Sequence, residues 1–125
     1  MSIDSQKILP AVRKIKDLER LLQTSYEYIV LLDSHIGQLH SLIELARRHG
    51  KQMLLHVDLI EGLKSDEYAA DFLCQQLRPA GLISTRANVV KQAKKNKRIA
   101  IQRLFLLDTG SLNKSYALME RTNPD

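Results

Sequence analysis

The sequence predicts an α/β fold in which short parallel strands alternate with helices. Five short apolar runs recur at intervals of about 25 residues, and a segment with hydrophobic residues at helical spacing follows each run. Connections of this length between strands favour parallel pairing with right-handed crossovers. We expect one domain that spans residues 1–125, since a chain of this length can bury a single core.

The predicted strands are the most apolar segments of the chain. The second has the sequence YIVLLD and is nearly continuous in its hydrophobicity, as is typical of a parallel strand covered on both faces. The last, IAIQRLFLLD, has the strongest strand pattern. The five strands are predicted at residues 8–13, 28–33, 52–58, 81–86 and 99–108.

Helix signals follow each strand. The predicted helices cover residues 17–23, 38–49, 68–77 and 88–96, with a last one after the fifth strand that ends before residue 123. Gly50 is expected to stop the second helix. Ser65 is expected to cap the third, and Thr109 or Ser111 the last.

The third helix is expected to be amphipathic. Its spacing directs Ala69, Phe72, Leu73 and Leu77 inward. Cys74 lies on the same helix, and we interpret it as a buried structural thiol. It is the chain's single cysteine, which excludes an internal disulfide framework and a zinc finger.

Two architectures fit this alternation: an open doubly wound sheet, or part of a (β/α)8 barrel. No GxGxxG or GxxxxGK[ST] motif follows a strand, which argues against a dinucleotide-binding or P-loop fold. A complete barrel needs about 200 residues or more. The chain therefore predicts either a small open α/β domain or an incomplete barrel.

Polar side chains collect where the predicted strands end, and parallel α/β folds bind ligands at that edge. These candidate residues are Asp33, His35, His56, Asp58, Glu61, Thr85, Arg86 and Asp108. Carboxylates there could perform acid–base chemistry or hold a cation, and Arg86 could hold a phosphate. Alternatively, these residues simply cap helices.

Strand alternation adds a prediction about direction. His56 and Asp58 should share a face, whereas Arg103 should point away from Gln102 and Asp108. We interpret His56, which lies between apolar neighbours, as an interior polar group rather than a metal ligand. No residues are predicted to be catalytic or to bind a metal.

Basic residues are concentrated in the last third of the chain. The net charge is +5; residues 1–85 contain ten basic and eleven acidic side chains, whereas residues 86–125 contain nine basic and three acidic ones. The cluster consists of Lys91, Lys94, Lys95, Lys97 and Arg98. It could attract a phosphate backbone, or it could be an ordinary solvated helix face.

No segment approaches the roughly 20 apolar residues of a membrane helix, and no signal peptide is visible at the start of the chain. We therefore expect a cytoplasmic protein with no membrane partner. No Ser/His/Asp order or HExxH motif indicates an enzyme class.

Five strings carry a resemblance to a known family. They are ILPAVRKIK at residues 8–16, LLDSHI at 31–36, LLHVDLIEGL at 54–63, GLISTR at 81–86 and IQRLFLLD at 101–108. In this order and spacing, the chain resembles the glycerol-uptake operon antiterminators, the glycerol-3-phosphate-responsive regulatory proteins of bacteria.

The resemblance implies a TIM-barrel-like fold and a cytoplasmic, non-enzymatic regulator of glycerol catabolism. It implies that the partner is leader mRNA of a glycerol operon and that glycerol 3-phosphate is the effector, with no other cofactor. It also implies ligand contact at matching residues, namely Asp33, His35, Asp58, Glu61, Thr85, Arg86 and Asp108. RNA contact is then expected at the basic cluster.

Family members usually continue with further βα units, so about the last third is expected to be absent from this chain. An unclosed barrel exposes strand edges, which predicts low stability as a monomer or self-association. Three other functions stay open: a sugar-phosphate-binding barrel enzyme, a truncated remnant without a ligand, and a protein–protein module. No lysine lies at a strand end to form a Schiff base, which counts against an aldolase.

Overall fold

A six-stranded sheet organises the chain. The computed structural model describes residues 9–108 and 115–122, with side chains described for residues 9–103. The sheet contains, in spatial order, β1 (Ala11–Val12), β2 (Tyr28–Leu31), β4 (Gln52–His56), β6 (Gly81–Ser84), β7 (Ile99–Asp108) and β8 (Ser115–Thr122). The first five strands are parallel, and β8 runs antiparallel to β7. A small second sheet pairs β3 (Ser34–His35) with β5 (Ile60–Glu61).

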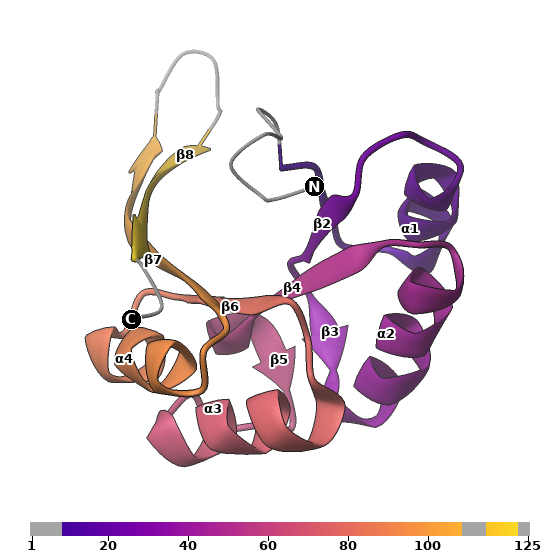
Figure 1. Cartoon of the computed structure of the whole chain (residues 1–125). Coiled ribbons are helices and arrows are strands. Elements are labelled where there is room, and N and C mark those ends of the chain that lie inside the picture. Colours follow the sequence, from indigo (N-terminus) through magenta and orange to yellow (C-terminus); the bar gives the residue numbers. More distant parts are fainter. Residues whose placement is uncertain (1–8, 109–114, 123–125) are drawn as a thin grey trace.

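Helices connect the parallel strands, and they lie outside the curve of the sheet: α1 and α2 at the right of Figure 1, α3 at the bottom and α4 at the lower left. They are α1 (Ile15–Leu22), α2 (Leu39–Arg48), α3 (Glu67–Phe72), which continues as a π-helical turn at Leu73–Leu77, and α4 (Ala87–Lys95). Single 3-10 turns occupy Ile36–Gln38 and Val57–Leu59. Four of the five predicted helices are therefore confirmed.

The described helices pack on one face of the sheet. The larger apolar cluster joins Leu31 and Leu55 of the strands to helix residues such as Leu18, Ile43 and Val89. The cluster on the opposite face contains strand residues and none from α1–α4. Successive parallel strands are also neighbours in the sheet. A doubly wound sheet has helices on both faces and a reversal of strand order, so the structure selects the incomplete TIM-barrel-like fold.

The face without helices corresponds to the interior of a barrel, and we call it the inner face. It consists of Tyr28, Val30, Leu54, Ile83 and Ile101, all buried. Strand alternation explains the division, because successive residues of a strand point to opposite faces. Ile29, Leu31 and Leu55, which alternate with these residues, pack in the helix-covered cluster.

The predicted last helix is wrong. Ser115–Thr122 forms β8, whose pairing with β7 runs from Asp108↔Ser115 to Ala100↔Thr122. The ten-residue β7 would otherwise present a long open edge, and an antiparallel partner satisfies its backbone groups. Periodicity within the segment could not reveal this long-range pairing. The predicted caps Thr109 and Ser111 lie outside the described residues.

The third helix differs from the prediction in two details. Its N-cap is Asp66, whose Oδ1 accepts a hydrogen bond of 2.9 Å from the Ala69 backbone N–H, whereas Ser65 donates elsewhere. Phe72 is 41% exposed rather than inward. The π-helical turn that follows departs from the helical spacing used for the prediction, while Leu73 and Cys74 are buried as expected.

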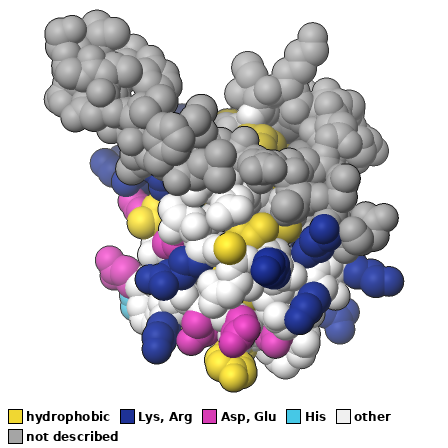
Figure 2. All heavy atoms as spheres, turned by 90° about the vertical axis from the view of Figure 1, so that its left-hand side faces the viewer, with side chains coloured by type: hydrophobic (Ala, Val, Ile, Leu, Met, Phe, Trp, Pro, Cys, Tyr) yellow, Lys and Arg dark blue, Asp and Glu magenta, His cyan; other side chains and the backbone are white. Residues whose placement is uncertain are grey.

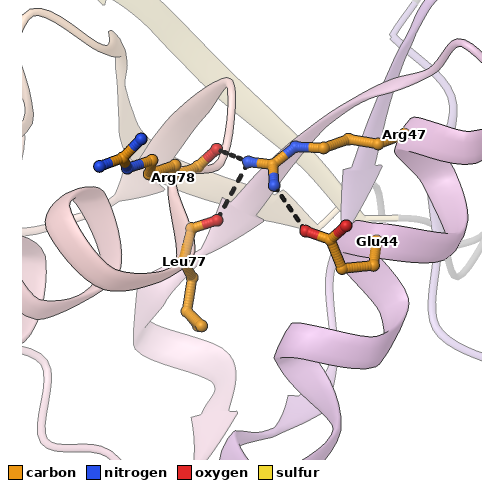
Figure 3. Close-up of polar contacts among 4 residues, drawn as sticks. All are labelled: Glu44, Arg47, Leu77 and Arg78. Carbon is orange, nitrogen blue, oxygen red and sulfur yellow. Dashed lines mark hydrogen bonds and ion pairs between the residues drawn. The ribbon is translucent and has the colours of Figure 1, made fainter.

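The outer helices are tied together by Arg47 of α2. Its guanidinium pairs with Glu44 at 2.7 Å and donates to the backbone oxygens of Leu77 and Arg78, where the π-helical turn ends (Figure 3). A cation at a helix C-terminus donates hydrogen bonds to free carbonyls and interacts favourably with the partial negative charge of that helix end. Arg78 itself closes the turn in a left-handed conformation with φ 53°.

All the predicted strands except the fifth end earlier than expected, and the second and fourth end at Leu31 and Ser84. The first is reduced to Ala11–Val12, and the third ends at His56, because a 3-10 turn follows at Val57–Leu59. The prediction that His56 and Asp58 share a strand face therefore fails, since alternation applies only within a strand. Gly50, with φ 72°, follows α2 as predicted.

Candidate functional site

Asp58 is the centre of a hydrogen-bond network at the carboxyl ends of β4 and β6. Its Oδ1 accepts from Ser65 Oγ at 2.6 Å and Ser84 Oγ at 2.5 Å. Its Oδ2 accepts from the backbone N–H of Thr85 at 2.8 Å and from Thr85 Oγ1 at 2.6 Å. Four donors of the chain thus use the accepting positions of this carboxylate.

This network lowers the pKa of the Asp58 carboxyl group. Burial by itself raises the pKa of the carboxyl, but the hydrogen bonds from Ser65, Ser84 and Thr85 outweigh burial and lower the pKa from 3.8 to about 2. Asp58 is therefore ionised at neutral pH and is already satisfied by its own chain. The carboxylate thereby connects the loop after β4, which contains Ser65, to the end of β6 at Ser84 and Thr85.

The network also places the start of α4. Ser84 Oγ, which donates to Asp58, accepts a hydrogen bond of 3.0 Å from the Arg86 backbone N–H. Arg86 is the N-cap residue of α4 in extended conformation, and its side chain is exposed. Thr85 and Arg86, both predicted site residues, are thus brought together with Asp58 at this edge.

His35 and Glu61 are brought together by the small second sheet. Both lie outside the five predicted strands, yet they are register partners in the β3–β5 pairing, and both side chains are exposed. His35 Nδ1 accepts from the Gly37 backbone N–H at 3.0 Å. Gly62, with φ 89°, completes the turn after Glu61, where a Cβ would meet Ile36 at 2.8 Å.

Asp33 lies apart from the Asp58 network. It pairs with Arg13 at 2.9 Å, and both side chains are about half exposed or more. The pair borders a small open pocket between α1 and α2, which is also lined by Lys14, Ile15, Leu18, Leu31, Gln38 and Leu42. Asp108 ends β7, and its side chain lies outside the described residues.

Sequence reasoning missed the contact between His56 and Arg103. His56 is 2% exposed, and its Nε2 lies 3.0 Å from Arg103 Nη1. Because a guanidinium can only donate, His56 Nε2 accepts and Nδ1 carries the proton. Within residues 9–103, that buried Nδ1 has no hydrogen-bond partner. Alternation predicts that Arg103 points away from Gln102, but it does not reveal which residue Arg103 contacts.

Burial keeps His56 neutral. It lowers the pKa of the imidazole, and the positive charge of Arg103 lowers the pKa further, against the opposite influence of Asp58, of the His56 backbone carbonyl and of Asp33. The interior position predicted for His56 is confirmed. The described partner of the Arg103 guanidinium is therefore a neutral imidazole, and no carboxylate within residues 9–103 forms an ion pair with it.

The basic cluster lies on α4 and the turn after it. Lys91, Lys95 and Lys97 are exposed, and Lys94 and Arg98 are half-buried. Figure 2 shows this side of the molecule, where lysine and arginine side chains are spread among acidic ones. The acidic residues of the adjacent α3 are Asp66, Glu67 and Asp71.

Asp71 connects the two helices directly. Its carboxylate accepts from Gln92 at 2.7 Å and from Asn96 at 2.9 Å. The hydrogen bonds from Asn96 and Gln92 lower the pKa of Asp71. The α4 surface is therefore basic at its end and mixed in charge toward α3.

Neither a cluster of metal-ligating side chains nor a membrane-spanning helix is found among the described residues. In that part of the chain, no group of three or more His, Cys, Asp or Glu side chains has the arrangement of a metal site. Among the same residues, the helices are too short or too polar to cross a membrane.

The parallel strands, one-sided helices and polar carboxyl edge define an α/β protein of the incomplete-barrel class. The particular family follows from a match over residues 8–125 to the model described as glycerol-3-phosphate responsive antiterminator. The chain belongs to this family.

Two solved structures are similar to the chain. The glycerol uptake operon antiterminator regulatory protein from Listeria monocytogenes strain 4b F2365 is 45% identical, with a TM-score of 0.81, over 90% of this chain and 61% of that one. A glycerol uptake operon antiterminator-related protein from Thermotoga maritima MSB8 is 23% identical, with a TM-score of 0.61, over 70% and 49% of the two chains. The second likeness concerns the fold alone.

A curated relative is the Escherichia coli (strain K12) protein YgcP, described as uncharacterised. It is 28% identical over 118 residues, which are 94% of this chain and 62% of YgcP. The chain thus spans about three fifths of the length of YgcP and of the Listeria protein.

Proposed function

We propose that this chain acts in transcription antitermination, binding leader mRNA of a glycerol operon in response to glycerol 3-phosphate. The observation that carries the proposal is the family match over residues 8–125. The 45% identity to an antiterminator regulatory protein supports it. The protein would act as a regulator rather than an enzyme, in the cytoplasm where transcription occurs.

The arrangement of the fold suggests how effector and RNA sites would be separated. The effector would bind at the carboxyl edge of the sheet, where parallel α/β folds bind ligands. Leader RNA would contact the basic residues at the end of α4, chiefly through its phosphates. These are Lys91, Lys94, Lys95, Lys97 and Arg98.

The Asp58 network offers a physical connection between the two sites. It fixes Thr85 and Arg86, and α4 begins at the next residue, Ala87. A ligand that changes this edge would shift the start of the helix that carries Lys94 and Lys95. Such a ligand strengthens RNA binding only if it binds the RNA-competent state more tightly than the other state.

A transcription assay tests the proposal. A template carrying the leader and terminator of a glycerol-uptake operon is transcribed once by purified bacterial RNA polymerase. The chain with millimolar glycerol 3-phosphate should raise read-through about fivefold or more over the chain with glycerol. Equal read-through with glycerol, with glycerol 3-phosphate and without the chain would refute this function.

A further inference from the structure

The inner face carries an excess of hydrogen-bond donors at its carboxyl end. Arg103 offers five N–H donors, and within residues 9–103 the contact to His56 uses one of them. The buried His56 Nδ1–H also has no acceptor in good hydrogen-bond geometry within residues 9–103. Because desolvated donors without acceptors are costly, this arrangement favours a ligand that supplies oxygen acceptors.

The nearby carboxylates do not supply them. Asp58 and Asp33 are the acids that influence His56 electrostatically. Asp58 receives four hydrogen bonds from Ser65, Ser84 and Thr85. Asp33 pairs with Arg13. Arg103, which is half-buried, is left as a cation whose charge no carboxylate in the described residues contacts.

The position of this cation is that of a ligand site. Ser84 at the end of β6 is in register with Gln102, so Arg103 lies just beyond the last residue of β6. His56 is the last residue of β4. His56 and Arg103 lie on β4 and β7, on either side of β6, and both stand near the level where β4 and β6 end, on the side that faces the barrel interior.

We propose that Arg103 binds a phosphate monoester at the inner face and that His56 is the positioning residue that holds its guanidinium. The planar fork of an arginine matches two oxygens of a phosphate, and a neutral His56 fixes the fork without neutralising its charge. This inference rests on the proposed function in one respect: the monoester is taken to be the glycerol 3-phosphate to which the family responds. It assigns phosphate recognition to Arg103, not to the exposed Arg86.

The full 125-residue chain, isotopically labelled, tests this by NMR of the histidine ring nitrogens, without RNA. The His56 signals are assigned by comparison with His56→Gln. Glycerol 3-phosphate should shift them in a saturable way, and inorganic phosphate should do so more weakly. Glycerol should leave them unchanged, and glycerate, which replaces the phosphate with a carboxylate, distinguishes a general oxyanion site from a phosphate site. His56 signals that ignore saturating glycerol 3-phosphate would overturn the inference without any variant.

Variants then separate Arg103 from the other arginines. Arg103→Gln should weaken glycerol 3-phosphate binding roughly tenfold or more, and Arg103→Lys should recover part of the loss. Arg48→Gln, at an exposed position on α2, is the matched control. Thermal unfolding checks that each variant folds. An affinity loss confined to Arg86→Gln, with Arg103→Gln unaffected, would contradict the assignment.

The NMR titration and the RNA assays can fail independently, so failure of the Arg103 site is distinguishable from failure of the proposed function. A His56 response to glycerol 3-phosphate without any effect on RNA would support the Arg103 site and count against antitermination by this chain. RNA binding that is stimulated by glycerol 3-phosphate, with His56 signals that do not shift, would support the proposed function and count against the Arg103 site.

Discussion

Ser84 Oγ donates a hydrogen bond of 2.5 Å to Asp58 Oδ1, across a separation of 26 residues in the sequence. The contact joins the carboxyl ends of two neighbouring strands and leaves Ser84 able to receive the Arg86 N–H. Removing the negative charge of Asp58 should therefore loosen the edge of the sheet and the start of α4 together.

Asp58→Asn should lower the free energy of unfolding by about 1–3 kcal/mol at pH 7, because an amide oxygen replaces only one of two accepting oxygens. Urea unfolding measures the change. Asp33→Asn, at the exposed pair with Arg13, is the control and should cost about 0–1 kcal/mol. Equal effects of the two substitutions would contradict the special role of the network.

The same carboxyl predicts a pH dependence. The folded-state pKa of Asp58, about 2, is below its ordinary value of 3.8, so the ionised group stabilises the folded state above pH 4. This contribution is lost as the pH falls from about 4 toward 2. After allowance for solvent screening, we expect a loss of about 1 kcal/mol in wild type that Asp58→Asn lacks. Parallel pH profiles of the two proteins would argue against this contribution.

Gly81 should not tolerate a side chain. A Cβ at this position would lie 2.4 Å from the Ile99 backbone oxygen, in the adjacent strand. Gly81→Ala should therefore cost about 2–3 kcal/mol of unfolding free energy. Gly50→Ala is the control, because a Cβ there meets nothing within 4 Å and the cost arises from φ 72° alone, about 1 kcal/mol. Urea unfolding that ranks the two in the opposite order would be inconsistent with this packing.

Cys74 should be unreactive in the folded protein. Burial raises the pKa of its thiol to about 11, against the opposing influence of Arg98. Because the thiolate is the nucleophile, a disulfide reagent at pH 8 should modify Cys74 slowly in buffer and rapidly in denaturant. Rapid modification under native conditions would show that the α3 packing opens readily.

The basic cluster should govern the salt dependence of RNA binding. Charge reversal of Lys94, Lys95 and Lys97 should weaken binding across RNA sequences. If each lysine contacts one phosphate, the slope of log affinity against log salt should also fall by about 2 for single-stranded RNA. Reversal of three exposed basic residues elsewhere, Lys16, Arg20 and Arg48, is the matched control. A similar loss in both triple variants would indicate a net-charge effect rather than a binding surface.

Much of the fold could be predicted because local signals and tertiary structure agree. The apolar run at β7 (Ile99–Asp108) and the glycine after α2 identify their elements directly. The last segment was predicted as a helix because periodicity does not encode the pairing of β8 with β7. Phe72, the last residue of α3 before the π-helical turn, was predicted to point inward but is 41% exposed, whereas Ala70 and Leu73 are buried.

The candidate site shows the same limit. The polar residues at strand ends were predictable, because parallel strands bring their carboxyl ends to one edge. Their partners were not, since Asp58 contacts Ser84 and Thr85 across 26 and 27 residues, and His56 meets Arg103 across 47. These contacts depend on strand order and register, which the sequence pattern leaves open.

The central claim, effector-dependent RNA binding by this chain, is tested most directly by titrating fluorescent leader RNA with the protein. The titration is made with glycerol 3-phosphate or with glycerol, at two salt concentrations. We expect RNA binding to be about fivefold or more tighter with glycerol 3-phosphate than with glycerol, and weaker at the higher salt concentration with either compound. RNA affinity that is identical with the two compounds would contradict it.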